Sequence, residues 1–248
     1  MKFIFTFFIL VLITTSCTKE NLPGPDAHSS TFDDPNWLKI ELPGEREAHS
    51  VYGDINDTLL VSTHMYIFMT VDQGKTWTKT ASFHSKTYNF LSAKDSLFAL
   101  TAHFLTDEYG YPLASYADEF SVDNGESWEY TGKYNISKDR KMKYAFAKSN
   151  GGTIYRLSEN IELFEGSETD GYVLKRTLLK GDAGSLSPVQ LPFDNQLTNL
   201  YIDKHNRLYI TATAAIHDEK SGKYVRNEDG NPAIIYISKE SADKLSFP

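Results

Sequence analysis

The sequence predicts an all-β fold, a β-propeller of antiparallel four-stranded blades that is small or incomplete, with about four blades. Two repeats lead to this expectation. A turn pattern, TVDQGKTW at residues 70–77, recurs as SVDNGESW at residues 121–128. A longer unit, made of two alternating apolar strands joined by a short Asp/Asn/Gly turn, recurs along the whole chain. Repetition of this kind is typical of repeat architectures.

The N-terminal residues 1–16 are predicted to be a signal peptide. One positive charge, Lys2, precedes a nearly unbroken apolar run that is too short to span a bilayer. Cys17, the only cysteine, follows directly. This arrangement is similar to a bacterial lipobox, in which the cysteine is lipidated, although Thr14 stands where lipoboxes usually have Leu. The alternative is an ordinary secretory peptide with an incidental cysteine.

Residues 17–34 are polar and rich in Pro and Gly, so we expect a lipidated, flexible tether. Residues 35–248 then form the propeller domain. No Asp follows Cys17, so the common inner-membrane retention signal is missing. The expected location is therefore extracytoplasmic, lipid-anchored at the outer membrane, on its periplasmic or surface side.

Each repeat unit is expected to hold four strands. Runs of period-2 alternation around Asp/Asn/Gly turns predict antiparallel hairpins for the first two strands, at residues 50–62, 88–100, 143–155 and 199–211. Third strands are predicted at residues 66–70, 119–122, 161–165 and 234–238, and fourth strands at residues 76–82, 127–134 and 172–179. The fourth unit lacks a last strand, and we expect residues 37–42 to supply it and so to remove exposed sheet edges.

The turn pattern has a physical basis at each position. The Asp accepts hydrogen bonds from the turn, the Gly takes a positive φ, and the Trp starts the next strand with a large ring to bury; these residues are Asp72, Gly74, Trp77, Asp123, Gly125 and Trp128. With these two turns the chain resembles the Asp-box (BNR) repeat proteins, a β-propeller group that includes sialidases and many non-catalytic secreted propellers.

The resemblance implies which face carries a site. In such propellers the Asp-box turns lie on the face opposite the usual site, and the loops after the second and fourth strands form the working face. The candidate ligand-binding residues on those loops are His64, His103, Tyr109, Tyr111, Arg140 and His217. A histidine cluster there can indicate a metal or anion site, but recurrence of strand-end histidines in related blades is the simpler reading. We therefore expect no metal and no other cofactor.

Function is less constrained than fold. The net charge of −8, with no basic patch, argues against a nucleic-acid partner. Sialidases need an arginine triad, a Tyr–Glu pair and an Arg-Ile-Pro signature, and none of the six arginines precedes Ile-Pro. We assign no catalytic residue. The favoured function is a binding or scaffolding module, attached to the membrane by its lipid, for a carbohydrate or protein ligand. The alternative is a degenerate or atypical sialidase-like glycoside hydrolase.

Overall fold

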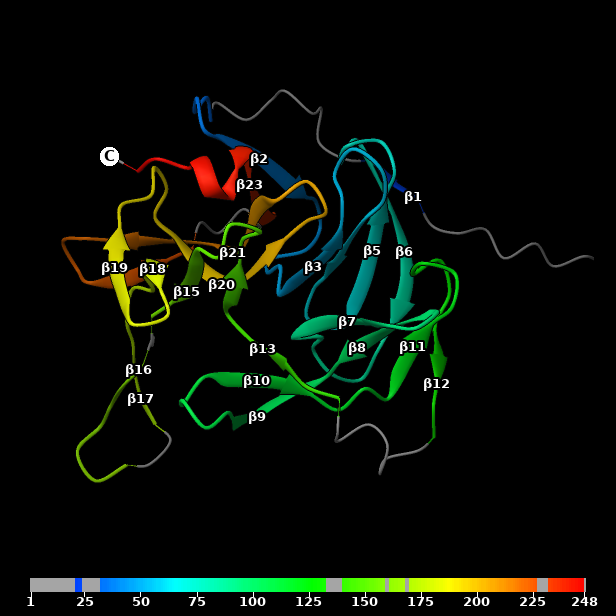
Figure 1. Cartoon of the computed structure of the whole chain (residues 1–248), viewed down its shortest axis with the longest axis horizontal. Helices are drawn as coiled ribbons and strands as arrows, with labels where there is room; N and C mark the ends of the chain where they lie inside the picture. Colours follow the sequence, from blue (N-terminus) through cyan, green and yellow to red (C-terminus); the bar gives the residue numbers. More distant parts are fainter. Residues whose placement is uncertain are drawn as a thin grey trace, which may run out of the picture.

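The computed structural model describes residues 21–23, 32–132, 140–158, 161–167, 170–226 and 232–247. These residues form antiparallel β-sheets, with one turn of 3-10 helix, η1 (Ala242–Lys244), and no α-helix among them. Five of the sheets have three or more strands, and one further pair of strands forms a separate hairpin (Figure 1). The predicted all-β propeller arrangement of antiparallel sheets is confirmed, with five larger sheets where about four blades were expected.

The first two units form the sheets that the sequence predicts. The first sheet contains β3 (Ser50–Gly53), β4 (Leu59–Ser62), β5 (Tyr66–Thr70) and β6 (Thr76–Ser82). The short strand β1 (Asn21–Pro23), within the segment predicted as a tether, pairs with the outer strand β6. Another sheet contains β7 (Asn89–Ala93), β8 (Ser96–Leu100), β11 (Glu119–Ser121) and β12 (Glu129–Tyr130).

The last sheet joins residues 37–42 to the C-terminal strands. Its strands are β20 (Asn195–Ile202), β21 (Arg207–Asp218), β23 (Ala233–Ser241) and β2 (Trp37–Leu42), and β22 (Lys223–Val225) pairs with the far end of β21. Strand β2 pairs with β23 along its whole length, from Trp37 opposite Ser238 to Leu42 opposite Ala233 (Figure 1). The predicted completion of this sheet by the strand near the N-terminus is therefore observed.

The prediction for the third unit is wrong in its outer half. Residues 161–165 and 172–179 were expected to be its third and fourth strands. Instead the sheet contains β14 (Phe146–Lys148), β15 (Ile154–Leu157), β18 (Leu178–Asp182) and β19 (Ser185–Val189), while β16 (Ile161–Leu163) and β17 (Gly171–Val173) form the separate hairpin. The sequence pattern does not indicate β19, because Pro188 interrupts it. An outer edge strand tolerates proline at a position where the backbone N–H would point outward and need no partner.

The fifth larger sheet comes from a segment predicted to be a loop. Within residues 101–117, β9 (Ala102–Thr106) and β10 (Pro112–Ser115) pair as a hairpin, and β13 (Met142–Lys143) joins β10. Asp107 accepts hydrogen bonds from the N–H groups of Tyr109 and Tyr111, at 3.0 and 2.8 Å, and so fixes the turn between them. The segment 101–117, predicted to be a long loop, is thus a β-hairpin.

Four strands, β3, β7, β14 and β20, meet at the centre of the arrangement. Strand β3 packs against β7 and β20, and β20 packs against β14. Buried amide side chains link neighbouring segments here: Asn199 Nδ2 in β20 donates to the Tyr88 carbonyl (2.7 Å), and Asn89 Nδ2 in β7 donates to the carbonyl of Lys143 in β13 (3.0 Å). The Asn199 Oδ1 accepts from the Ala145 N–H at 2.8 Å. These hydrogen bonds satisfy buried polar groups of neighbouring units and so help to hold the central strands together.

Hydrophobic side chains fill the spaces between neighbouring sheets. One core cluster lies between the first and last sheets and includes the fully buried Leu42, Trp77 and Tyr209. Another joins the last sheet to the β7 and β14 sheets and includes the fully buried Tyr155 and Leu208. Each sheet therefore depends on its neighbours for burial of its apolar face.

The first Asp-box turn has the geometry that its residue types predict. Asp72 Oδ1 accepts from the Thr76 N–H and the Thr70 hydroxyl, both at 2.9 Å, and Oδ2 accepts from the Thr76 hydroxyl at 2.6 Å. The Thr70 hydroxyl in turn accepts from the Gly74 N–H at 2.9 Å. Gly74 has a φ of +83°, and a Cβ there would lie 2.8 Å from Cγ2 of Ile40 in β2. The turn therefore needs glycine for its conformation and for its close approach to the last sheet.

The second Asp-box turn repeats this network. Asp123 accepts from the Ser127 N–H and hydroxyl and from the Ser121 hydroxyl, and Ser121 accepts from the Gly125 N–H. Burial opposes ionisation of Asp123, but these hydrogen bonds lower its pKa to about 2. A Cβ on Gly125 would lie 2.3 Å from a methyl carbon of Leu60 in the first sheet. Each turn thus fastens its own sheet to the preceding one.

Candidate functional site

The structure separates the six candidate residues into different surroundings. Tyr109 is 75% exposed at the β9–β10 turn. Tyr111 packs beside Phe146, with the Lys143 Nζ 4.1 Å from its ring centroid. The Arg140 guanidinium lies 3.6 Å from the Phe98 ring centroid. These three therefore lie apart from one another: Tyr111 contacts β13 and β14, Arg140 contacts the β7 sheet, and Tyr109 is exposed to solvent.

His103 belongs to a cluster of aromatic rings at the starts of the central strands. Its ring centroid lies 4.1 Å from that of Tyr88 and 5.9 Å from that of Tyr144, and the two tyrosine rings are 5.6 Å apart. The Arg176 guanidinium lies 5.9 Å from the Tyr144 ring. Burial lowers the pKa of His103, and the charges of Arg176 and Lys86 lower it further, so His103 is neutral at pH 7. We call these five residues the axial cluster.

A group of ionised side chains adjoins the axial cluster through Lys86. Glu47 pairs with Lys86 (3.6 Å), Arg226 (2.6 Å) and the buried His49 (3.4 Å). The contacts with His49 and Arg226 hold the pKa of Glu47 well below its usual range, against the opposing effect of burial. Burial in turn lowers the pKa of His49. The exposed His64 lies on this side, close enough to contribute to the lowering of the His49 pKa.

Arg176 connects the axial cluster to a cavity of about 330 Å³. Its Nη1 donates to the Thr198 carbonyl at 2.9 Å, whereas its buried Nε has no hydrogen-bond partner in the described part of the chain. The polar and aromatic lining of this cavity includes Lys175, Arg176, Phe193, Asp194, Asn195 and Glu219. A guanidinium with hydrogen-bonding capacity to spare, placed beside a cavity, is suited to an acceptor group on a ligand.

His217 lies on the other side of this region. Its backbone N–H donates to the Asp194 carbonyl at 2.8 Å, and its ring packs at 5.4 Å against Tyr224. The Tyr224 hydroxyl accepts a hydrogen bond from the backbone N–H of Arg176 at 3.3 Å. Of the six candidates, the structure therefore brings two close to Arg176: His103, whose pKa its charge lowers, and His217, which contacts it through Tyr224.

Sequence reasoning missed the central residues of this site. Glu47, His49, Lys86, Tyr88 and Tyr144 all lie at or just before the starts of β3, β7 and β14. In a propeller, the starts of the first strands of successive units converge near the centre. The positions of these five residues at such strand starts could therefore have identified them. Arg176 had no such signal, because the outer strands of its unit were predicted wrongly.

The described residues contain no group of three or more His, Cys, Asp or Glu side chains that could hold a metal ion. Within the same ranges, no helix has the length and apolar character needed to cross a membrane. Cys17, the predicted lipidation site, and the predicted signal peptide 1–16 lie outside the described residues.

No protein-family model matches the chain, and no curated protein matches it. Among solved structures, the WD40 domain of Neurospora crassa Pan2 aligns at 10% identity and a TM-score of 0.35, covering 87% of this chain and 98% of that one. A Bacteroides caccae protein of unknown function aligns at 14% identity and a TM-score of 0.28, covering 76% and 86%. YCF48 bound to D1 peptide aligns at 12% identity and a TM-score of 0.21, covering 79% and 71%.

Proposed function

We propose that this protein is an extracytoplasmic, lipid-anchored binding module of the Asp-box propeller group, and that it binds an acidic carbohydrate at the axial cluster and the adjoining cavity. The observation that carries the proposal is the Arg176 guanidinium, which lies beside the Tyr144 ring, lines the cavity, and has a buried Nε with no hydrogen-bond partner among the described residues. Aromatic rings suit the apolar faces of sugars, and the cations Arg176 and Lys86 suit a carboxylate or sulfate group.

The residue types favour recognition over hydrolysis. Glycosidases of the usual kind place two carboxylates on either side of the scissile bond. Around the axial cluster, Glu47 is already paired with three basic side chains, and Asp194 with Lys175 at 2.5 Å. The arginines also contact separate groups, with Arg226 on Glu47 and Arg207 on Asp54. A sialidase-like hydrolase remains the second candidate, and a protein ligand the third.

We expect Arg176→Gln to weaken binding of an acidic glycan by about 10- to 100-fold, because a charged hydrogen bond is lost. The binding partner is first identified on an array of acidic and neutral glycans, and affinities are then measured by titration calorimetry. Lys94→Gln is the matched control, since it removes one exposed positive charge from the turn between β7 and β8, away from the axial cluster. Equal affinity of Arg176→Gln and wild type, or steady hydrolysis of a fluorogenic sialoside that Arg176→Gln abolishes, would refute a binding module of this kind.

Membrane attachment through Cys17 is the second part of the proposal. It is supported by the apolar N-terminal run and by the position of the only cysteine directly after it. Cells grown with an alkyne fatty acid should label the wild-type protein and leave Cys17→Ala unlabelled. Equal labelling of the two proteins contradicts lipidation at this residue.

We further propose that the propeller has four blades, with β9, β10 and β13 forming an insertion in the second. This count is supported by the four strands β3, β7, β14 and β20 that pack in succession at the centre, whereas the three-stranded sheet contacts the centre through the Lys143 carbonyl at the end of β13. An experimental structure in which that sheet contributes its own strand to the centre would contradict it.

A further inference from the structure

The hairpin of β16 and β17 carries exposed apolar side chains on both of its faces. Exposed fractions are 49% for Ile161, 50% for Leu163, 43% for Phe164 and 63% for Tyr172. Because side chains alternate along a strand, Ile161 and Leu163 lie on one face, and Phe164 and Tyr172 on the other. The Phe164 and Tyr172 rings pack edge-on at 4.7 Å, so the second face is ordered.

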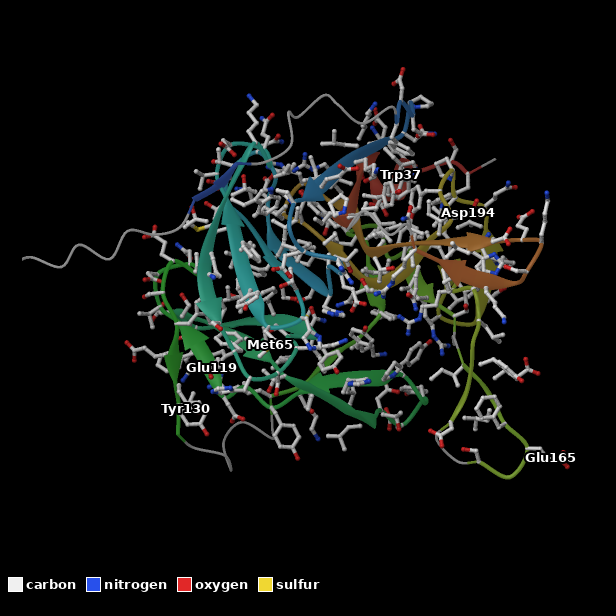
Figure 2. The ribbon with its side chains drawn as sticks, turned by 180° about the vertical axis from the view of Figure 1, so that it is seen from behind. Trp37, Met65, Glu119, Tyr130, Glu165 and Asp194 are labelled. Atoms are coloured by element: carbon white, nitrogen blue, oxygen red, sulfur yellow. The ribbon has the colours of Figure 1, made fainter. Side chains whose placement is uncertain are left out.

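This hairpin projects away from the sheets. Among the described strands, β16 and β17 hydrogen-bond only to each other. Figure 2 shows Glu165 at the far end of the hairpin, at the edge of the molecule. An isolated two-stranded hairpin is at best marginally stable in water, so a hairpin with two apolar faces calls for a surrounding surface. A flat surface covers one face, whereas a groove covers both.

The same chain has an apolar groove with complementary charge. A cavity of about 320 Å³ lies along the central strands β14 and β20, and its walls include Met142, Phe146, Leu200 and Ile202. Among the described residues that line it, the charged ones are Lys143 and Lys148, and none is a carboxylate. By contrast, residues 161–174 include four acidic residues and no Lys or Arg.

We propose that the β16–β17 hairpin of one copy inserts into the β14–β20 groove of a second copy, and that the exchange is reciprocal. The apolar faces would then be buried between copies, with Glu162 or Glu165 opposite Lys148. Reciprocal exchange uses the same two surfaces on each copy and therefore closes into a two-fold dimer. This proposal is independent of the ligand proposed for the axial cluster.

Disulfide trapping between copies tests the contact directly. Two differently tagged full-length chains, both carrying Cys17→Ala, receive one new cysteine each, Leu163→Cys in one and Lys148→Cys in the other. After mixing in detergent and oxidation, we expect at least about tenfold more mixed disulfide dimer than with Val71→Cys in place of Leu163→Cys, because docking raises the effective concentration of the two thiols. Val71 is a suitable control, since it is 65% exposed and lies in the first Asp-box turn. Equal yields from both mixtures overturn the proposal.

The mass in solution provides a second test. Light scattering should give a dimer for the wild type and a monomer for the double variant Leu163→Ser/Phe164→Ser, whose exposed positions leave the fold intact. Lys148→Glu alone should also be a monomer, because it places like charges opposite each other. Mixing Lys148→Glu with Glu165→Lys restores opposite charges between the two chains and should give a mixed dimer. A wild-type monomer at the concentrations of the trapping experiment, or a dimer that persists in the double variant, overturns the proposal.

Discussion

Leu42→Ala is expected to lower the free energy of unfolding by about 2–5 kcal/mol, because it removes a fully buried side chain from the core between the first and last sheets. Leu38→Ala, in the same strand, should change it by less than about 1 kcal/mol, because Leu38 is 38% exposed. The two variants make the same chemical change near opposite ends of β2 and differ in how far the side chain is buried. Urea unfolding followed by tryptophan fluorescence measures both.

Deletion of residues 35–43 should have a larger effect. It removes the whole of β2, leaves β23 with an unpaired edge, and uncovers Ile235 and Ile237. An exposed apolar edge strand pairs readily with other chains, so we expect aggregation on expression. If the deletion variant remains soluble with an unchanged melting temperature, or if Leu42→Ala and Leu38→Ala lose equal stability, β2 is not part of the folded core.

Arg207→Leu should destabilise the protein by about 3–5 kcal/mol, because it leaves two buried carboxylates without their main positive partner. The Asp203 and Asp54 side chains are 0% and 3% exposed. Arg207 Nε donates to Asp203 Oδ2 at 2.8 Å, and Nη2 donates to Asp54 Oδ1. Arg226→Leu is the control: its pair with Glu47 is largely exposed on the arginine side, and such pairs contribute about 0–1 kcal/mol.

The effect of Arg207→Leu should also depend on pH. Burial would raise the pKa of Asp54, but the Asn56 N–H and the Arg207 guanidinium bring it below its ordinary value of 3.8. Since the folded-state pKa is the lower one, the stabilisation from ionised Asp54 is present above about pH 4 and is lost as the pH falls through the folded-state pKa. The stability difference between wild type and Arg207→Leu should therefore shrink between pH 7 and pH 3. A constant difference across this range would show that the ion pairs are not its origin.

The sequence predicts this fold where local pattern and long-range packing agree. Period-2 alternation and the Asp-box turns identify the first two units, and the missing last strand identifies β2. Local pattern fails in the third unit, because residues 161–165 alternate like a buried strand while Ile161 and Leu163 are half exposed. It also fails for residues 101–117, where an aromatic and acidic loop composition conceals the β9–β10 hairpin.

The candidate site is harder to predict, because its residues meet only after distant strands pack together. The sequence selects His103 and His217, which lie in β9 and β21 rather than in the predicted loops. It does not reveal that Tyr88, Tyr144 and Arg176 surround them, since these come from three separate units. Tyr109 and Arg140 are candidates only because they lie in predicted loops. A loop position in the sequence does not show whether a side chain reaches the central strands.

The pairing of β2 with β23 also has a consequence for the order of folding. Strand β2 is synthesised early, but its only partner among the described strands is one of the last to leave the ribosome. Until then, β2 has a free edge and exposes Trp37 and Leu42, and the loop that must close is nearly as long as the domain. Such non-local pairing makes folding slow and leaves incomplete chains open to aggregation. A truncated copy can therefore never conceal these residues, so proteases and chaperones can distinguish it from the finished protein.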